Sequence, residues 1–501
     1  MAVSAAPSQE KPTKLPHIFF VVVDDLGWAD VGFHRTEKVP EVSTPVMDNL
    51  VKDGIELTRH YVHMFCTPSR ASLQSGRLPV HVLTGWSEPR DPKGAIPEGM
   101  TGIAAVLKRG GYATHQVGKW DAGMATPAHT PKGRGYDSSL NYFSHGIWMY
   151  SGSEWLGSED HVQEVPPPGL HDLWDTDKPA TAFVGEEYIE YTFRRRMLDI
   201  LHAHDQSKPL FLQYDSRLAH YPLQAPEEYQ ERFAHVKQDN RRMYSAMVNF
   251  LDDQLANITD TMKHLGMWDN TLMILTSDNG GFVRDPLGPC VGQGSAQFLA
   301  TGRQQQGVDG THGTVCFNGE AGANNYPLRG GKYSNFEGGI RVNAFVSGGF
   351  LPEKVRGSKL EGMIHIADWY RTLAEGIAGV DPTDKWAADS GLPPIDSLNM
   401  WPMLSGANLT SPREEVGILV TKDLLVKGRW KYVRGGSKMI EAASGGPHYP
   451  NASTATDPID AHQFNCPEQG CLYDVVADPT EIHEVSADNP DVVAMMKAEL
   501  L

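Results

Sequence analysis

Short apolar runs alternate along the chain with longer amphipathic stretches. The segment His17–Val23 is apolar after its first residue and stops at acidic residues, and Leu210–Tyr214 and Thr271–Thr276 are similar runs that end in polar residues. Such runs, rich in β-branched and aromatic residues, predict buried strands. Apolar residues at helical spacing predict a long amphipathic helix over Arg241–Leu265. Strands that alternate with helices predict an α/β fold.

The same reasoning gives three further elements and one long loop. Thr44 and Pro45 open a predicted helix, because proline suits a first helical turn. Gly111–Val117 predicts a strand and Ile364–Ala374 predicts a helix. The stretch Phe282–Ala323 is rich in Gly, Gln and Thr and has little periodicity, so we expect a loop on the surface or on the substrate side.

The length of 501 residues exceeds what one core usually supports, which favours a large domain and a smaller one. The Pro-, Asp- and Gly-rich segment Gly379–Asp396 predicts the boundary. Beyond it, Gly417–Val420 and Arg429–Val433 alternate in the manner of short strands. We therefore expect a large α/β domain over residues 1–378 and a smaller domain with an antiparallel sheet over residues 379–501.

Charge and hydropathy narrow the classes of partner. Lys and Arg number 44 and Asp and Glu 62, and the net charge of -18 argues against general binding to nucleic acid or anionic membrane. The longest purely apolar run, Ile18–Val23, is far shorter than the roughly 18 residues of a membrane span. Met1–Leu15 lacks the apolar core of a signal peptide. We expect a secreted, periplasmic or lysosomal protein whose signal peptide is absent from this chain, and a cytoplasmic location stays open.

Five cysteines are present. Apart from Cys66, they allow two disulfides, of which the local pairing is Cys290 with Cys316 and Cys466 with Cys471, although three pairings exist. In a second interpretation, zinc is held by Cys466, Cys471, His462 and His483, but this spacing fits no common zinc finger. Sequons compatible with glycosylation stand at Asn257, Asn408 and Asn451.

Cys66 stands where a helix is predicted to begin. It opens the segment Cys-Thr-Pro-Ser-Arg, in which Pro68 suits a first turn, and Gly76 suits the helix end. A residue at a helix start faces unpaired backbone N–H groups and the positive end of the helix dipole, where anions bind. At this point two interpretations stand: a residue for anion chemistry, or a buried cysteine beside a turn.

Two pairs of oxygen-bearing side chains follow predicted strands. Asp24 and Asp25 come directly after the first strand, and Asp278 and Asn279 after the strand that begins at Thr271. Residues just past such strands lie at the active edge of an α/β sheet. Hard oxygen ligands favour calcium or magnesium over zinc. Either pair alone is also typical of a turn, but two pairs in matching contexts favour a metal site.

The segment Cys66–Arg77 resembles the signature of the type I sulfatases, Cys-x-Pro-Ser-Arg followed by Gly-Arg. A tyrosine phosphatase would need Arg six positions after the cysteine, where this chain has Ser72. The resemblance implies that a formylglycine-generating enzyme oxidises Cys66 to formylglycine, whose hydrated aldehyde is the nucleophile. It also implies an alkaline-phosphatase-like mixed sheet flanked by helices, with the catalytic domain over residues 1–378 and a smaller α+β domain after it.

The resemblance implies roles for the polar residues. One divalent cation, most often Ca²⁺ with Mg²⁺ as the alternative, is bound by residue 66 and the four residues Asp24, Asp25, Asp278 and Asn279. Three cations of matching sequence blocks neutralise sulfate oxygens and protonate the leaving oxygen, namely Lys119, His220 and Lys332. Arg70 is expected to hold residue 66 and the acids in place.

One position departs from the family pattern. The usual block is Gly-Lys-Trp-His-Leu-Gly, with its histidine on the formylglycine hydroxyl, whereas this chain has Asp121 after Trp120. Asp121 is therefore the catalytic candidate at this place, since a carboxylate can accept that hydroxyl proton. It is also a negative charge near an anionic substrate. An intact base, a shifted pH optimum and impaired turnover are three open outcomes.

Two blocks, His129–Phe143 and Tyr326–Arg341, are most similar to the arylsulfatase B group, which removes sulfate from N-acetylgalactosamine 4-sulfate units. The resemblance thus implies a sulfated carbohydrate as substrate. Two alternatives are a phosphate or phosphonate monoester hydrolase on the same scaffold, and a pseudo-sulfatase that binds sulfated glycans without turnover. The second alternative arises from Asp121.

Overall fold

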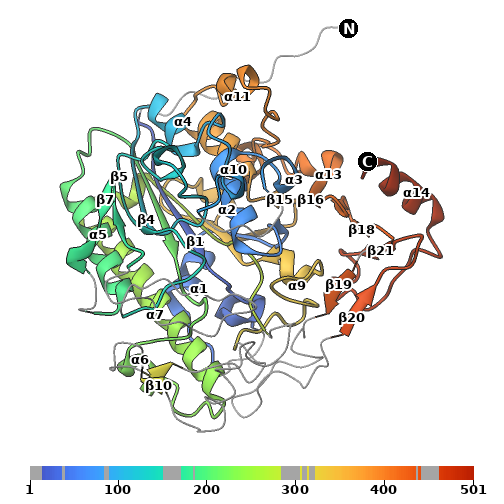
Figure 1. The fold of residues 1–501 in the computed structure, drawn as a ribbon, viewed down its shortest axis with the longest axis horizontal. Coiled ribbons are helices and arrows are strands. Elements are labelled where there is room, and N and C mark those ends of the chain that lie inside the picture. Colours follow the sequence, from blue (N-terminus) through green and yellow to red (C-terminus); the bar gives the residue numbers. More distant parts are fainter. Residues whose placement is uncertain are drawn as a thin grey trace.

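A mixed sheet of ten strands forms the centre of the molecule (Figure 1). The computed structural model describes residues 14–35, 40–83, 90–150, 171–183, 187–283, 305–306, 313–314, 322–435, 438–441 and 462–500. The strand order is β14 (Ser358–Leu360), β2 (Ile55–Leu57), β13 (Ala344–Ser347), β9 (Thr271–Ser277), β1 (His17–Val23), β8 (Leu210–Ser216), β4 (Ala113–Lys119), β5 (Ser138–Tyr142), β6 (Trp174–Asp175) and β7 (Lys178–Pro179).

The parallel strands at the middle of this sheet confirm the predicted α/β class. β1 pairs in parallel with β8 on one side and β9 on the other, and β13 pairs antiparallel with β9. β4 begins at Ala113 rather than at the predicted Gly111. Gly111 has a φ of 86°, a conformation that a turn uses and a strand does not.

β1 is buried along its whole length and packs on both sides. Phe19, Val21 and Val23 contact one core, whereas Phe20 and Val22 contact another, because successive side chains point to opposite faces. The first core is covered by α1 (Pro45–Lys52), α5 (Ile189–Ala203), α6 (Glu227–Arg232) and α7 (Asp239–His264). The second is covered by α2 (Cys66–Ser75), α4 (Ile103–Arg109), α10 (Asp368–Arg371), α11 (Lys385–Asp389) and α12 (Trp401–Leu404).

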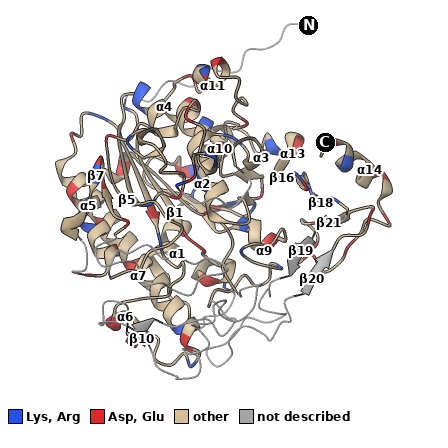
Figure 2. Ribbon diagram, viewed as in Figure 1, with Lys and Arg blue, Asp and Glu red and all other residues tan. Residues whose placement is uncertain are grey.

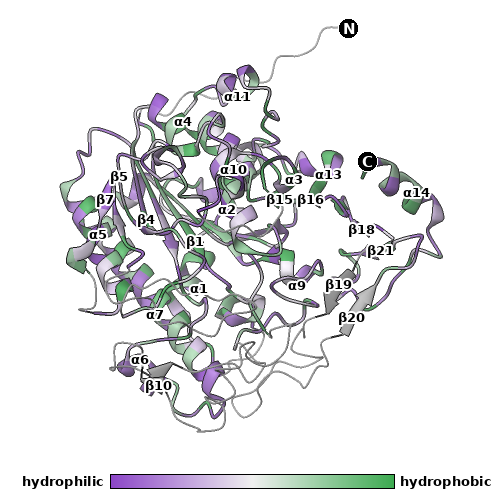
Figure 3. Ribbon diagram, in the orientation of Figure 1, coloured by the Kyte–Doolittle hydropathy of each residue, from purple (hydrophilic) through white to green (hydrophobic). Residues whose placement is uncertain are grey.

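The colouring of the ribbons agrees with this layered core. Hydrophobic residues concentrate in the central strands (Figure 3), whereas charged residues mark outer helices such as α5 and α11 (Figure 2). The two predicted helices at Pro45 and around Arg241 are confirmed as α1 and α7. No helix within the described ranges is long and apolar enough to cross a membrane.

The helix predicted over Ile364–Ala374 is wrong in its first half. Ile364 and His365 form strand β15, which pairs in parallel with β3 (His60–Tyr61), and β3 also pairs with β12 (Arg341–Val342). Only from Asp368 does the chain turn into α10, which continues as a π-helical turn over Thr372–Ile377. Ile364 and His365 pair with the backbone of β3, and this tertiary pairing outweighs the helical periodicity of their sequence.

The second part of the chain carries the expected small antiparallel sheet. It consists of β16 (Ile418–Thr421), β17 (Leu424–Lys427), β18 (Trp430–Val433) and β21 (Cys471–Asp474), with α14 (Pro490–Glu499) beside it (Figure 1). Shorter elements are α3 (Pro79–Val82), α9 (Glu337–Ile340), α13 (Arg413–Val416), and the pairs β10 (Gln305–Gln306) with β11 (Gly313–Thr314) and β19 (Lys438–Glu441) with β20 (His462–Asn465).

A disulfide joins Cys466 to Cys471 and confirms the local pairing predicted for them. Because both sulfurs are used in that bond, the zinc interpretation of these cysteines is wrong. The other predicted pair, Cys290 with Cys316, lies outside the described residues. The domain boundary at residue 378 stays a prediction, since Ala387 and Met403 beyond it pack into the core of the large sheet.

Buried charges join the small sheet to the large one. Lys431 of β18 lies with its Nζ 3.2 Å from Oε1 of Glu337 in α9, and it also pairs with Glu481. The hydroxyl of Tyr61 donates to Oε2 of Glu337 at 3.0 Å. All four side chains are fully buried, and burial raises the pKa of Glu481 to about 7. Each charge is therefore stable there only while its partner is present.

We expect Lys431→Met to destabilise the protein by about 3–5 kcal/mol, because it leaves the buried Glu481 without its cation and Glu337 with only Arg341, whose Nη1 lies 3.6 Å from Oε2. The midpoint of urea unfolding measures this change. Lys427→Met on the neighbouring strand is the matched control. It removes an ion pair with Glu499 in which both side chains are partly exposed, so the loss should stay below about 1 kcal/mol. Equal effects of the two variants would contradict the assignment.

Candidate active site

The oxygen-bearing side chains predicted to meet at one sheet edge do so. In the parallel register of β1 and β9, Val23 lies opposite Ser277, so the next two residues of each strand emerge side by side. The amide nitrogen of Asn279 donates to Oδ1 of Asp25 at 2.7 Å, and the backbone N–H of Asp25 donates to Oδ1 of Asp278 at 3.4 Å. Asp24, Asp25, Asp278 and Asn279 are all at most 1% exposed.

Cys66 is the first residue of α2, as its sequence context predicts. Phe65 before it is extended, Pro68 lies in the first turn, and Gly76 ends the helix with a φ of 69°. The Sγ atom of Cys66 lies 3.6 Å from Oδ1 of Asp24. The helix start therefore directs its unpaired N–H groups and its positive dipole end toward the acidic strand ends.

Each of three acids has its own buried cation. The Nζ atom of Lys119, at the end of β4, lies 2.8 Å from Oδ2 of Asp24, and that of Lys332 lies 2.8 Å from Oδ1 of Asp25. Arg70, one turn into α2, places Nη2 2.8 Å from Oδ2 of Asp278. The residues are predicted from three separate sequence blocks. The fold brings them together at one edge.

His220 follows β8 and lies next to the same acids, with Nε2 3.8 Å from Oδ2 of Asp25. Its Nδ1 is hydrogen-bonded to the carbonyl of Tyr221, which makes Nδ1 the donor. Burial lowers the pKa of His220 well below its ordinary value. Burial by itself thus favours the neutral imidazole, and the role of a cation at this position stays a prediction.

The arrangement fits a divalent cation. Ligand atoms of Asp24, Asp25, Cys66 and His220 all lie within 4.8 Å of one another. Oδ1 of Asn279 is buried and has no hydrogen-bond partner, which leaves an amide oxygen available to a ligand. Buried carboxylate and amide oxygens at one place are the donor set of a hard cation.

The charges of the acids point the same way. Burial raises the pKa of Asp278 to about 7, and the neighbouring Asp24 adds to this. Burial also raises the pKa of Asp25 despite its contact with Lys332. For Asp24 burial acts in the same direction, but His220 and Lys119 outweigh it and hold the pKa below its usual range. Burial thus disfavours the charged forms of Asp25 and Asp278, and a bound cation would favour them.

Cys66 is not an activated thiol. Burial raises the pKa of the Cys66 thiol well above its ordinary value, and Lys119 and Lys332 offset this only in part. The nucleophilic form of cysteine is the thiolate, which is disfavoured in such surroundings. The position suits an anion-binding residue, whereas the thiol itself suits no nucleophilic step.

Asp121 comes directly after β4 and Trp120, and it adopts a left-handed φ of 45°. Its Oδ1 accepts a hydrogen bond from Oγ1 of Thr67 at 2.9 Å and lies 3.0 Å from Nδ1 of His145. Its Oδ2 lies 3.4 Å from Nζ of Lys119. Burial would raise the pKa of Asp121, but His145 and Lys119 outweigh burial and lower it. The side chain is therefore a carboxylate.

Two residues of this cluster are not predicted from the sequence. His145 lies in a loop after β5, in no motif and at no diagnostic spacing from Asp121. Asp215 lies within the buried strand β8, where its Oδ1 is 3.3 Å from Nη1 of Arg70. A carboxyl inside an apolar strand is the signal that would have identified Asp215. Burial raises its pKa to about 6.

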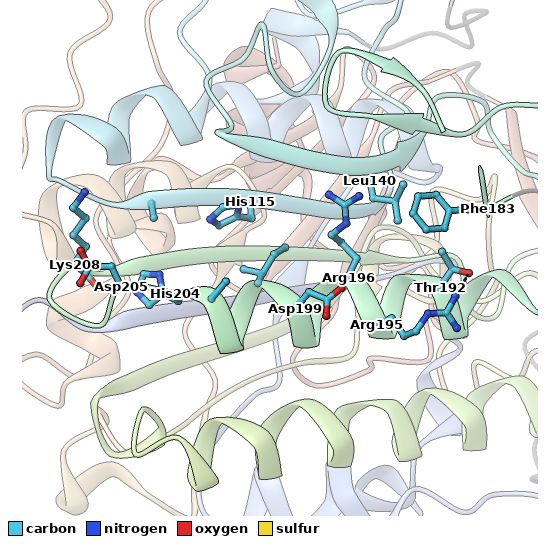
Figure 4. A pocket seen from close by; sticks show the side chains of 13 residues that line it. His115, Leu140, Phe183, Thr192, Arg195, Arg196, Asp199, His204, Asp205 and Lys208 are labelled. Carbon is cyan, nitrogen blue, oxygen red and sulfur yellow. Dashed lines mark hydrogen bonds between the residues drawn. The ribbon is translucent and has the colours of Figure 1, made fainter. Parts of the chain in front are cut away.

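The cavity shown in Figure 4 lies elsewhere. It has a volume of about 530 Å³ and lies between α5 and strands β4 and β5, where His115, Arg196 and Lys208 are among the side chains that line it. None of the predicted catalytic residues lines it. The buried acidic edge is therefore the candidate active site.

A mixed sheet with buried acids, three paired cations and a helix-starting cysteine at one edge defines a hydrolase of the alkaline-phosphatase-like fold with a group of side chains that could hold a metal ion. The chain belongs to the sulfatase family, whose family model, "Sulfatase", matches residues 16–379. It is accordingly a hydrolase of sulfuric esters. Members of this family generally use a divalent cation and formylglycine.

Comparison with individual proteins supports the same family. Arylsulfatase J of Mus musculus is 31% identical over 97% of this chain and 75% of its own length. N-acetylgalactosamine-6-sulfatase of Homo sapiens is 25% identical over 81% of this chain and 67% of its own. The crystal structure of Ps i-CgsB in complex with k-i-k-neocarrahexaose has a TM-score of 0.69, is 24% identical and covers 97% of this chain and 93% of its own, which shows a shared fold.

We expect the unmodified Cys66 thiol to react with iodoacetamide at pH 8 at least about tenfold more slowly than an exposed cysteine, because burial and the raised pKa suppress the thiolate. Peptide mapping of the alkylated Cys66 peptide measures the rate. A Ser207→Cys variant supplies the exposed thiol for comparison. Unfolding in urea should abolish the difference. Equal rates in the folded protein would mean that Cys66 is accessible and ionised.

Proposed function

We propose that the protein hydrolyses a sulfate ester of a sulfated carbohydrate, with Cys66 converted to formylglycine and with Ca²⁺ at the acidic edge. The observation that carries this proposal is the buried contact set of Cys66, Asp24 and Lys119 at the edge of the sheet. The carbohydrate substrate is supported by the human relative, whose name states that it acts on N-acetylgalactosamine 6-sulfate. The two sequence blocks similar to arylsulfatase B support the same class.

The proposed metal ligands are residue 66 together with Asp24, Asp25, Asp278 and Asn279. The bound cation would polarise sulfate oxygens, and formylglycine would supply the attacking oxygen. Calcium fits better than magnesium because the donors come from two strand ends and a helix start, which form an irregular set, and Ca²⁺ tolerates irregular coordination. His220 is proposed to protonate the leaving oxygen from Nε2 when its imidazole carries both protons.

The remaining residues act on charge and orientation. Lys119 and Lys332 bring two positive charges into a site shielded from water, where they stabilise sulfate oxygens more strongly than at a surface. Arg70 ties Asp278 to Asp215 and thereby fixes the side of the site that faces α2. Asp121 is proposed as the base beside residue 66. The disulfide between Cys466 and Cys471 supports an oxidising compartment.

We expect protein made together with a formylglycine-generating enzyme to carry an aldehyde in the Cys66 peptide and to release sulfate from at least one member of a panel of sulfated sugars. Cys66→Ala should reduce this release to background, because it lacks a group that can be converted. Peptide mass and ion chromatography of sulfate measure the two effects. Phosphate and phosphonate monoesters serve as competing substrates. Preferred turnover of these esters, or an unmodified active thiol, would refute the proposal.

We expect one Ca²⁺ per chain, and we expect Asn279→Ala to weaken its binding at least about tenfold because the variant loses a neutral oxygen ligand. Calorimetric titration of chelator-treated protein measures the affinity. Asn257→Ala is the control, since that amide is exposed on α7 and only bonds its own helix. Tight binding of zinc in place of calcium, or unchanged affinity in the Asn279 variant, would show that the ligand set is wrong.

A further inference from the structure

The chain lacks the histidine expected after Trp120, yet an imidazole lies against the residue that replaces it. His145 reaches this place from the loop after β5, and its Nδ1 is 3.0 Å from Oδ1 of Asp121. We infer that Thr67, Asp121 and His145 form one acid–base unit beside residue 66, in which Asp121 accepts the proton and His145 is its positioning residue. This inference deepens the proposed function and rests on it.

The two carboxylate oxygens of Asp121 have different surroundings. Oδ1 is held from two sides, by the Thr67 hydroxyl at 2.9 Å and by His145. Oδ2 is buried and has no hydrogen-bond partner, and its nearest charge is Nζ of Lys119 at 3.4 Å. A buried acceptor without a donor is costly unless a ligand supplies one. Oδ2 is therefore the atom available to a proton donor in the site.

The local backbone holds this geometry. The N–H of Trp120 donates to the carbonyl of Tyr142 at 2.8 Å, which fastens the end of β4 to the end of β5 and keeps the loop with His145 beside Asp121. The left-handed φ of Asp121, uncommon for a residue other than glycine, turns its side chain out of the strand direction. Thr67 directly follows residue 66 in the first turn of α2, so Asp121 is connected to that turn.

The charges around Asp121 keep it ionised. The titratable groups that lower its pKa include His145 from the loop, Lys119 from β4 and Arg70 from α2, while Thr67 offers a neutral hydroxyl. Burial raises the pKa of Asp121, and these groups together lower it below its ordinary value.

The proposed step is a proton transfer only. Asp121 takes a proton at Oδ2 from a hydroxyl at residue 66, one O–H bond breaking as another forms, and the carboxyl becomes neutral. It then returns the proton to water, and the carboxylate is restored. His145 keeps Oδ1 occupied throughout, so the proton is taken up at Oδ2.

A double-mutant cycle on the unmodified thiol form tests the pair without using activity. We expect His145→Leu and Asp121→Asn to lower Tm together by clearly less than the sum of their separate effects. His81→Leu is the matched control, because His81 makes a similar contact, 2.8 Å from Asp396, outside the site. It should show no coupling to Asp121→Asn. Full additivity at positions 121 and 145 would overturn the pairing.

The kinetics of the enzyme whose Cys66 has been converted to formylglycine test the roles of Asp121 and His145. Asp121→Asn should lower kcat roughly 100-fold, as loss of a general base does. His145→Leu should lower kcat roughly tenfold with little change in KM. It should also move the acidic limb of the kcat profile to higher pH, because without His145 burial raises the pKa of Asp121 and the carboxylate is lost earlier as pH falls.

Two outcomes separate this inference from the proposed function. If His145→Leu lowers Tm but leaves kcat and the acidic limb unchanged, the contact is structural and the inference is overturned. If the wild type releases no sulfate from any ester although its Cys66 peptide carries the aldehyde, the proposed function fails and the acid–base role fails with it. Coupling in the unmodified form would then still establish the pair itself.

Discussion

The structure depends on pairing negative and positive charges at the buried edge of the large sheet. Asp24 and Asp25 are inside the protein because they follow a strand that is apolar on both faces, and they are tolerable there only because Lys119 and Lys332 lie within 2.8 Å. The sheet, the helices and the loops therefore all have to place an oppositely charged group beside each buried charge. Charges at this edge come from the ends of β1, β4 and β9 and from α2.

That requirement explains why the site is built from distant sequence segments. A buried acid needs a cation that is itself held rigidly, and strand ends and helix starts supply rigidity better than loops. Arg70 comes from the same helix as Cys66, so the residue to be modified and the cation of Asp278 are fixed by one element. This arrangement constrains the backbone, because few backbone changes near residue 66 would leave all of these ion pairs intact.

The strands and the acids could be predicted from sequence because each signal is local. An apolar run followed by Asp-Asp, or by Asp-Asn, carries its own context. Ile364 and His365 could not be placed, since their strand exists only through pairing with β3. His145 could not be predicted for a similar reason: its contact with Asp121 arises where two strand ends are hydrogen-bonded, and neither residue's neighbours in sequence indicate it. Sequence motifs also do not report the burial of His220, which lowers its pKa.

The contact between Lys431 and Glu337 has a consequence for how this chain can be recombined. Glu337 lies five residues after Lys332, and its partners Lys431 and Glu481 belong to the second part of the chain. A chimera that joins the large sheet of this protein to the terminal sheet of a relative would have to supply a cation and a carboxyl at the same buried points. Without them, replacing the terminal sheet would disturb the segment that carries Lys332. The terminal sheet therefore helps to hold the active site in place.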